Sequence, residues 1–112
     1  MEKFMLIFAN TPSAQPPSPE VMQAIMGKWM AWIDKLKKDG KYLSGEPLFP
    51  TGKVVKGADK KVTDGPYAEG KEIIGGYFIV NAANYDEAVA LSKDYPDFDK
   101  GGSVHVRQIQ KM

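Results

Sequence analysis

The stretch KFMLIFA, residues 3–9, decides the fold of this chain. Side chains alternate between the two faces of a β-strand. Both faces of this stretch are apolar, with Phe4, Leu6 and Phe8 on one and Met5, Ile7 and Ala9 on the other. A strand that is apolar on both faces is buried on both, so we expect it in the centre of a sheet.

The segments that follow alternate between helix and strand patterns. Ser18 predicts the N-cap of a helix over Glu20–Lys38, in which apolar residues recur at spacings of three and four. The stretch YLSGEPLF, residues 42–49, predicts a short strand. A polar hairpin is expected after it, with turns at 57–59 and at 64–66.

The second half of the chain repeats the order of strand, helix and strand. Glu72–Asn81 is the second strong strand, and the Gly75-Gly76 pair inside it predicts a bulge or a close approach of another backbone. We expect a helix at 85–92 and a last strand at 103–109.

This order is typical of the split βαβ plait, the ferredoxin-like fold. We therefore predict one α+β domain spanning residues 1–112, with both helices on one face of an antiparallel sheet. The first strand is apolar on its other face as well, and no further element is left to cover that face. A homodimer that stacks the two sheets face to face would cover it.

Composition narrows the range of partners. The 112 residues include 15 basic and 14 acidic side chains, for a net charge of +1. This balance gives no reason to expect nucleic acid or an anionic membrane as a partner. The absence of cysteine excludes disulfides and thiol catalysis, and one histidine without a calcium-loop spacing predicts no metal site. The sequence carries no cofactor signature, and its first apolar run is too short for a signal peptide or a membrane span, so we predict a cytoplasmic protein.

The string DGPYAEGKEIIGGY, residues 64–77, and the string GGSVHVRQI, residues 101–109, resemble the DGPF-type branch of the YCII-related proteins. That branch is named for an Asp-Gly-Pro-Phe stretch, in which Tyr67 replaces the Phe here. The resemblance covers essentially the whole chain. It implies a ferredoxin-like fold that pairs into a dimeric α/β barrel. Some relatives are encoded with, or fused to, extracytoplasmic-function sigma factors, which implies a regulatory role as one alternative.

The broader YCII group has been proposed to hold enzymes that use a His-Asp pair, with the His on the first helix. Segment 20–38 of this chain contains no histidine. Its single histidine is His105, on the last strand, where the branch more usually has Glu. Asp94 lies one residue away from the position of that group's Asp. The resemblance therefore does not carry the pair over to this chain.

The last strand supplies a candidate site on the sheet face away from the helices. Alternation puts Val104 and Val106 on one face and His105 and Arg107 on the other. Asp64, at a hairpin turn, is expected at the mouth of a cleft between the two stacked sheets. Asp64 and His105 are the candidate catalytic residues for proton transfer. The candidate ligand-binding residues are Arg107, Tyr77, Tyr67 and Trp29.

Structural alternatives stand beside these roles. Asp64 can cap its own turn through bonds to backbone N–H groups. His105 can be a hydrogen-bonded structural residue, and Arg107 can pair with an acid such as Asp64 or Glu69. Trp29 can be part of the core.

Two functions therefore stay open. One is the binding of a small molecule in a cleft between the sheets of the dimer, with or without cofactor-independent acid/base catalysis. The other is a non-catalytic accessory or regulatory dimer, linked to sigma-factor-dependent transcription. A pocket with convergent polar groups favours the first function, and a filled cleft with an exposed apolar patch favours the second.

Overall fold

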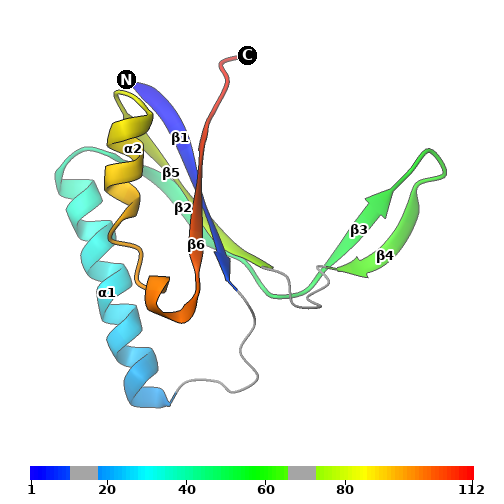
Figure 1. The fold of residues 1–112 in the computed structure, drawn as a ribbon, viewed down its shortest axis with the longest axis horizontal. Helices are drawn as coiled ribbons and strands as arrows, with labels where there is room; N and C mark the ends of the chain where they lie inside the picture. Colours follow the sequence, from blue (N-terminus) through cyan, green and yellow to red (C-terminus); the bar gives the residue numbers. More distant parts are fainter. Residues whose placement is uncertain (11–17, 66–72) are drawn as a thin grey trace.

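The computed structural model describes residues 1–10, 18–65 and 73–112. Figure 1 shows two helices on one side of a sheet and a two-stranded hairpin that projects away from that sheet. The elements in chain order are β1 (Glu2–Asn10), α1 (Pro19–Lys38), β2 (Tyr42–Pro47), β3 (Gly52–Lys56), β4 (Lys61–Gly65), β5 (Ile73–Ala82), α2 (Tyr85–Ser92), the short 3₁₀ helix η1 (Phe98–Lys100) and β6 (Ser103–Gln108).

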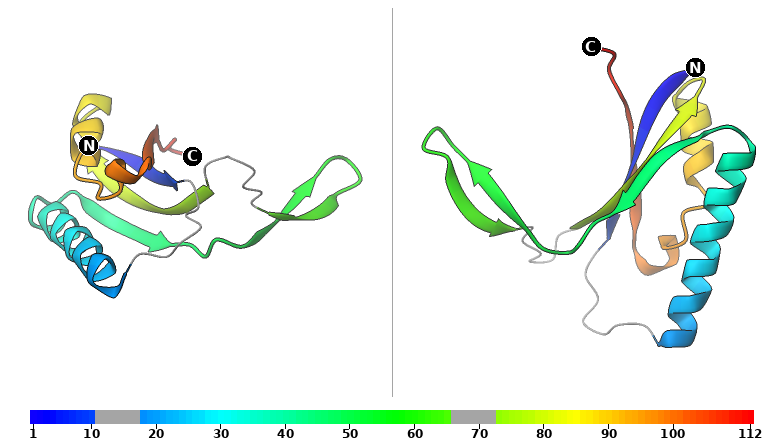
Figure 2. Two further views of the ribbon diagram at one scale, coloured as in Figure 1. Left: turned by 60° about the horizontal axis from the view of Figure 1, so that its bottom comes forward. Right: turned by 180° about the vertical axis from the view of Figure 1, so that it is seen from behind.

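Four strands form one antiparallel sheet in the order β2-β5-β1-β6. β1 lies between β5 and β6, which confirms the central position predicted for the stretch 3–9. α1 and α2 lie on the same face of this sheet (Figure 2). The strand order and the layering are those of the split βαβ plait, so the ferredoxin-like α+β fold is confirmed.

Polar side chains fix where the two helices begin. Ser18 Oγ accepts a hydrogen bond from the Val21 amide at 3.3 Å, as predicted for the N-cap of α1. Asn84 Oδ1 accepts one from the Glu87 amide at 3.0 Å at the start of α2. After α1, Gly40 takes the left-handed conformation with φ of 69°, where the chain turns back toward the sheet.

The core lies between the sheet and the helices. Its largest fully buried side chains come from β1, β5 and α1, and they are Phe4, Leu6, Leu36 and Val80. Trp32 of α1 is also buried, and its Nε1 donates to the Leu91 carbonyl oxygen at 3.0 Å. This bond satisfies the indole N–H inside the core and links α1 to α2.

The Gly75-Gly76 pair of β5 shows both features that its position in a strand predicted. The register between β1 and β5 shifts after Phe8, so Gly75 is an extra residue in β5. A Cβ on Gly76 would lie 2.8 Å from the Glu46 carbonyl oxygen of β2. The close approach of β2 therefore requires glycine at this position.

Gly45 of β2 is a second position without room for a side chain. A Cβ there would collide with the Phe78 ring and lie 2.8 Å from the Tyr77 carbonyl oxygen. Because one of these neighbours is backbone, the strand must shift to accept it. We expect Gly45→Ala to lower the free energy of unfolding by about 2 kcal/mol, measured by chemical denaturation.

Gly27 provides the matched control for this substitution. It lies in α1, where a Cβ would meet nothing within 4 Å. Gly27→Ala is expected to raise the free energy of unfolding by about 1 kcal/mol, because alanine favours the helix. A Gly45→Ala protein as stable as the wild type would contradict the packing of Phe78 against β2.

β3 and β4 form a two-stranded sheet of their own, which projects from the rest of the molecule (Figure 1). A polar hairpin was predicted here, and its turn at 57–59 is present. The second turn was predicted at 64–66. That prediction is wrong for Asp64 and Gly65, which are the last two residues of β4, and residue 66 lies outside the described residues. The 3₁₀ helix η1 was not predicted.

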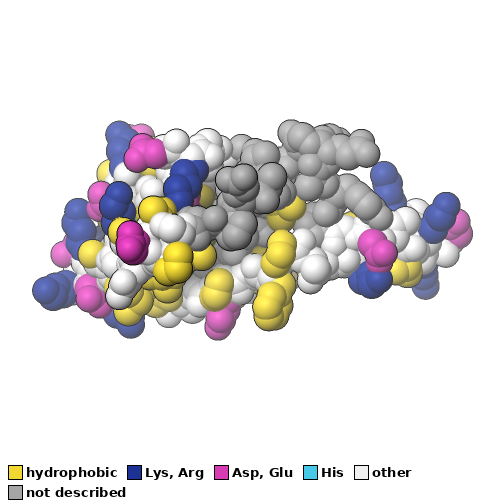
Figure 3. Space-filling model, turned by 90° about the horizontal axis from the view of Figure 1, so that it is seen from below, with side chains coloured by type: hydrophobic (Ala, Val, Ile, Leu, Met, Phe, Trp, Pro, Cys, Tyr) yellow, Lys and Arg dark blue, Asp and Glu magenta, His cyan; other side chains and the backbone are white. Residues whose placement is uncertain are grey.

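The sheet face opposite the helices is less buried than the helix-facing one. Met5 and Ile79 are register partners on it, with Ile7 beside them, and all three side chains are half-buried. Within the described parts of the chain, no element covers this face (Figure 2). Exposed hydrophobic side chains are also visible on the body and toward the base of the hairpin (Figure 3). A second copy that covers the open sheet face stays a prediction.

Candidate ligand-binding cavity

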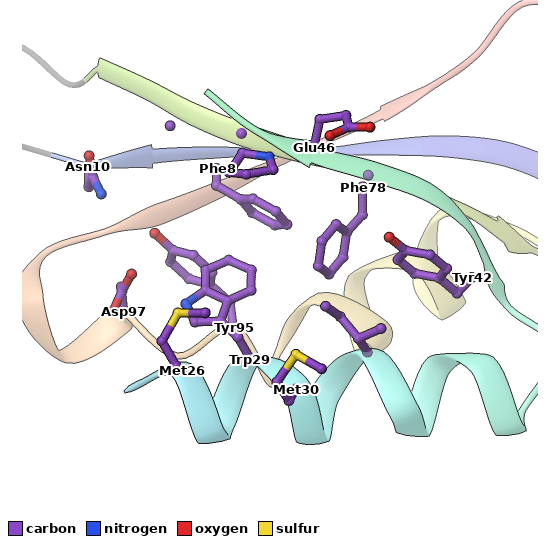
Figure 4. A pocket seen from close by; sticks show the side chains of 15 residues that line it. Phe8, Asn10, Met26, Trp29, Met30, Tyr42, Glu46, Phe78, Tyr95 and Asp97 are labelled. Carbon is purple, nitrogen blue, oxygen red and sulfur yellow. The ribbon is translucent and has the colours of Figure 1, made fainter. Parts of the chain in front are cut away.

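A cavity of about 360 Å³ lies between α1 and the β2–β5 side of the sheet (Figure 4). It opens on the helix-facing side of the sheet. Its lining comes from β1, α1, β2, β5 and the loop after α2, and consists of Phe8, Asn10, Met26, Trp29, Met30, Ile33, Tyr42, Gly45, Glu46, Pro47, Gly75, Gly76, Phe78, Tyr95 and Asp97.

Glycines placed opposite phenylalanines make room for this cavity. Phe8 has Gly76 as its partner on β5, and Phe78 has Gly45 as its partner on β2. Because Gly45 carries no side chain, the Phe78 ring can lie across it. The ring centroids of Phe8 and Phe78 are 4.9 Å apart, with an interplanar angle of 87°. Large side chains in place of these glycines would fill part of the space beside the sheet, so the glycines leave room for the cavity.

Aromatic rings form the walls. The Trp29 ring of α1 lies 5.1 Å from Phe8 and 5.6 Å from Tyr95, at interplanar angles of 73° and 82°. Phe8 and Tyr95 are stacked at 5.3 Å. Edge-to-face contacts of this kind hold rings in fixed orientations, so the cavity has a defined shape. Met26 and Met30 are about half exposed and form its rim on α1.

The polar groups gather at one end. In Figure 4 the Asn10 amide, the Tyr95 hydroxyl and the Asp97 carboxylate lie at the same end, beyond the Trp29 and Phe8 rings. Tyr95 is 4% exposed, and its hydroxyl lies against Gly102, where a Cβ would come within 2.6 Å of it. The Asp97 backbone carbonyl accepts hydrogen bonds from the amides of Lys100 and Gly102, both at 3.1 Å, which fixes the position of Asp97.

Tyr42 supplies a hydroxyl at the other end of the cavity. Burial, more than the nearby Glu46 charge and Tyr77, raises the pKa of Tyr42 above its ordinary value. Tyr42 therefore stays protonated at neutral pH and can donate a hydrogen bond. Glu46 pairs in register with Tyr77, and its carboxylate lies on the opposite side of β2 from the aromatic walls (Figure 4).

The predicted site residues fall into three places. Trp29 lines the cavity. Tyr77, His105 and Arg107 lie on the open sheet face, where Ile7 stands between Tyr77 and His105 in register. Val104 and Val106 pack against the core on the other side of β6, as alternation predicted. The thickness of the sheet therefore separates Trp29 from Tyr77, His105 and Arg107.

Asp64 lies in the third place, on the projecting hairpin. Its side chain is 74% exposed and forms an ion pair with Lys53, its register partner on β3. The hairpin carries it away from β6 (Figure 1), so Asp64 and His105 do not converge within one chain. Tyr67 and most of the DGPF string lie outside the described residues.

Sequence reasoning did not identify Phe8, Tyr95 and Asp97 as site residues. Phe8 was assigned to the core of β1, and the segment after α2 shows no periodic pattern. A signal was available in the glycines, because Gly45 and Gly76 lie inside two predicted strands, where a missing side chain leaves space. The strand register, which reveals the pairing, comes from the fold.

Comparison with known proteins supports this fold. The chain is similar to the solved structure of 5-chloro-2-hydroxyhydroquinone dehydrochlorinase from Burkholderia phenoliruptrix AC1100, in complex with 2,5-dihydroxybenzoquinone. The TM-score is 0.56 at 20% identity, covering 98% of this chain and 95% of the other, a similarity that shows a shared fold alone. No curated protein matches the sequence. The model of the YCII-related domain matches residues 2–112, and the chain therefore belongs to the YCII-related domain family.

Proposed function

We propose that this protein binds a small organic molecule in the cavity between α1 and the sheet. The observation that supports this is the cavity itself, an aromatic-walled space of about 360 Å³ with polar groups at one end. A mostly apolar cavity with a few convergent polar groups is the usual form of a small-molecule site. The dehydrochlorinase of similar fold is in complex with 2,5-dihydroxybenzoquinone, a single-ring compound. A ligand of that size suits a cavity of this volume.

We propose further that the protein acts as a cytoplasmic homodimer of the DGPF branch. The half-buried Met5, Ile7 and Ile79 support a sheet-to-sheet interface, because an apolar face of this kind is stabilised by a second copy. In such a dimer, His105 and Arg107 would border the cleft between the sheets. Asp64 and His105 do not converge within one chain. They could act together in acid/base chemistry only if each came from a different copy of the dimer. The open cavity favours ligand binding over a purely accessory or regulatory role.

A screen of neutral single-ring compounds by ¹⁵N NMR tests the binding site. The two tryptophans give separate indole signals. Trp29 lines the cavity, and the Trp32 indole is bonded to Leu91 behind it. We expect compounds that bind with dissociation constants of about 1 mM or tighter to shift the Trp29 signal, with little change at Trp32.

Gly75→Val sharpens this test. Gly75 lines the cavity, and a Cβ there would have Asn10 Nδ2 as its nearest neighbour at 4.0 Å, so valine is accommodated but narrows the space. It should weaken binding at least fivefold. Ile74→Val, at the exposed neighbouring position outside the lining, should leave binding unchanged. Compounds that shift signals of the open sheet face and leave Trp29 unmoved would contradict the proposal.

A further inference from the structure

We infer that the ligand of this cavity is an organic cation, a protonated or quaternary amine on an apolar body, held by the Asp97 carboxylate at the end of the aromatic walls. This inference rests on the proposed function and names the chemical class of ligand for the same cavity. Three observations carry it: the Asp97 carboxylate has no partner among the described residues, the cavity has aromatic walls, and the lining includes no basic residue among those described.

Asp97 has a half-buried side chain, and its carboxylate makes no hydrogen bond or ion pair with any described residue. It stands at the N-cap of η1 but does not cap it through its side chain. Elsewhere in the described residues, carboxylates form ion pairs with lysines, as Asp64 does with Lys53 and Asp94 with Lys35. A carboxylate that lines the cavity without a partner among the described residues is available to a cation bound there.

The rings beside Asp97 suit a cation as well. Trp29 stands nearly perpendicular to both Phe8 and Tyr95, at 73° and 82°. Phe8, Trp29 and Tyr95 all line the cavity. The π face of an aromatic ring carries partial negative charge and attracts ammonium groups, most strongly when the site is shielded from water. The apolar body of the ligand can then lie between Phe78 and the methionines of the rim (Figure 4).

The charges of the lining point the same way. Among the described lining residues, Asp97 and Glu46 are the ionisable groups that carry charge at neutral pH, and none is basic. An anionic ligand would therefore find no cationic partner among these residues, and would face the negative potential of the Asp97 carboxylate. A neutral ligand could use Asn10 or Tyr42, but would leave Asp97 without a counter-charge.

A matched set of probes tests the charge preference. 2-Phenylethylamine, 2-phenylethanol and phenylacetate carry the same ring and differ in charge. Titration calorimetry, together with the Trp29 indole signal, should give the amine a dissociation constant at least tenfold below those of the alcohol and the acid. Asp97→Asn should weaken amine binding about tenfold and leave alcohol binding within twofold. Asp99→Asn, the same charge change at an exposed position of η1, should leave the binding of all three unchanged.

Other outcomes overturn the inference. If the alcohol binds as tightly as the amine and Asp97→Asn has no effect, the cation is excluded while the cavity stays a ligand site. If phenylacetate binds most tightly, the cation is excluded as well. If none of the three moves the Trp29 signal, the inference fails, and the screen of neutral compounds decides the proposed function separately.

Discussion

Phe8→Ala is expected to lower the free energy of unfolding by about 4 kcal/mol. The ring is 6% exposed and lies within 5.6 Å of four aromatic partners: Trp29, Trp32, Phe78 and Tyr95. Its removal leaves a hole at the junction of β1, β5 and α1. Neighbouring rings cannot close that hole easily, because each is held by others of the cluster. Urea denaturation followed by far-UV circular dichroism measures the loss.

Phe98→Ala is the control, because it removes a phenylalanine ring that lies outside the buried cluster. Phe98 is 44% exposed, and among the described residues its one ring partner is Tyr95. Phe98→Ala is expected to cost about 1 kcal/mol or less. The same cluster forms the walls of the cavity, so Phe8→Ala should also weaken binding of 2-phenylethylamine. Equal costs for the two substitutions would contradict the central place of Phe8 in the core.

Ile7→Asp is expected to convert the proposed homodimer into a folded monomer. Ile7 lies at the centre of the open sheet face, between Tyr77 and His105 in register. In one chain its side chain is half-buried, so an aspartate there stays hydrated and the fold survives. Stacked against a second sheet, the same carboxylate would be buried without a partner. We expect the dimer dissociation constant to rise at least a hundredfold, measured by analytical ultracentrifugation.

Met22→Asp is the control for this substitution. Met22 is 46% exposed near the start of α1, on the helix layer, where a negative charge suits the helix dipole. It should leave the mass in solution unchanged. A wild-type protein that sediments at 12.4 kDa at micromolar concentration would contradict the dimer outright.

The sequence predicted the elements of the fold because the signals for them are local. Ser18 caps α1 through a bond to an amide three residues away, and such a pattern can be recognised without knowledge of the fold. The two-sided apolar pattern of β1 predicted a central strand for the same reason. η1 was missed because a three-residue 3₁₀ turn has no period to recognise.

The candidate site was harder to predict because it depends on contacts between distant segments. The segment between α2 and β6 brings Asp97 to the cavity that Trp29 also lines, and no spacing in the sequence encodes that arrangement. Asp64 was predicted to be catalytic because it begins the string that resembles the DGPF branch. In the structure it forms an ion pair with Lys53 on the projecting hairpin. Alternation did place His105 and Arg107 on the correct sheet face, and the cavity lies on the other one.

A crystal structure of the protein with bound 2-phenylethylamine tests the central claim most directly. We predict ligand density between α1 and the sheet, with the ring against Trp29 and Phe8. The ammonium nitrogen should lie about 2.7–3.2 Å from an Asp97 carboxylate oxygen, the range of charged hydrogen bonds. Density on the open sheet face, beside His105 and Arg107, with the cavity empty, would contradict the account.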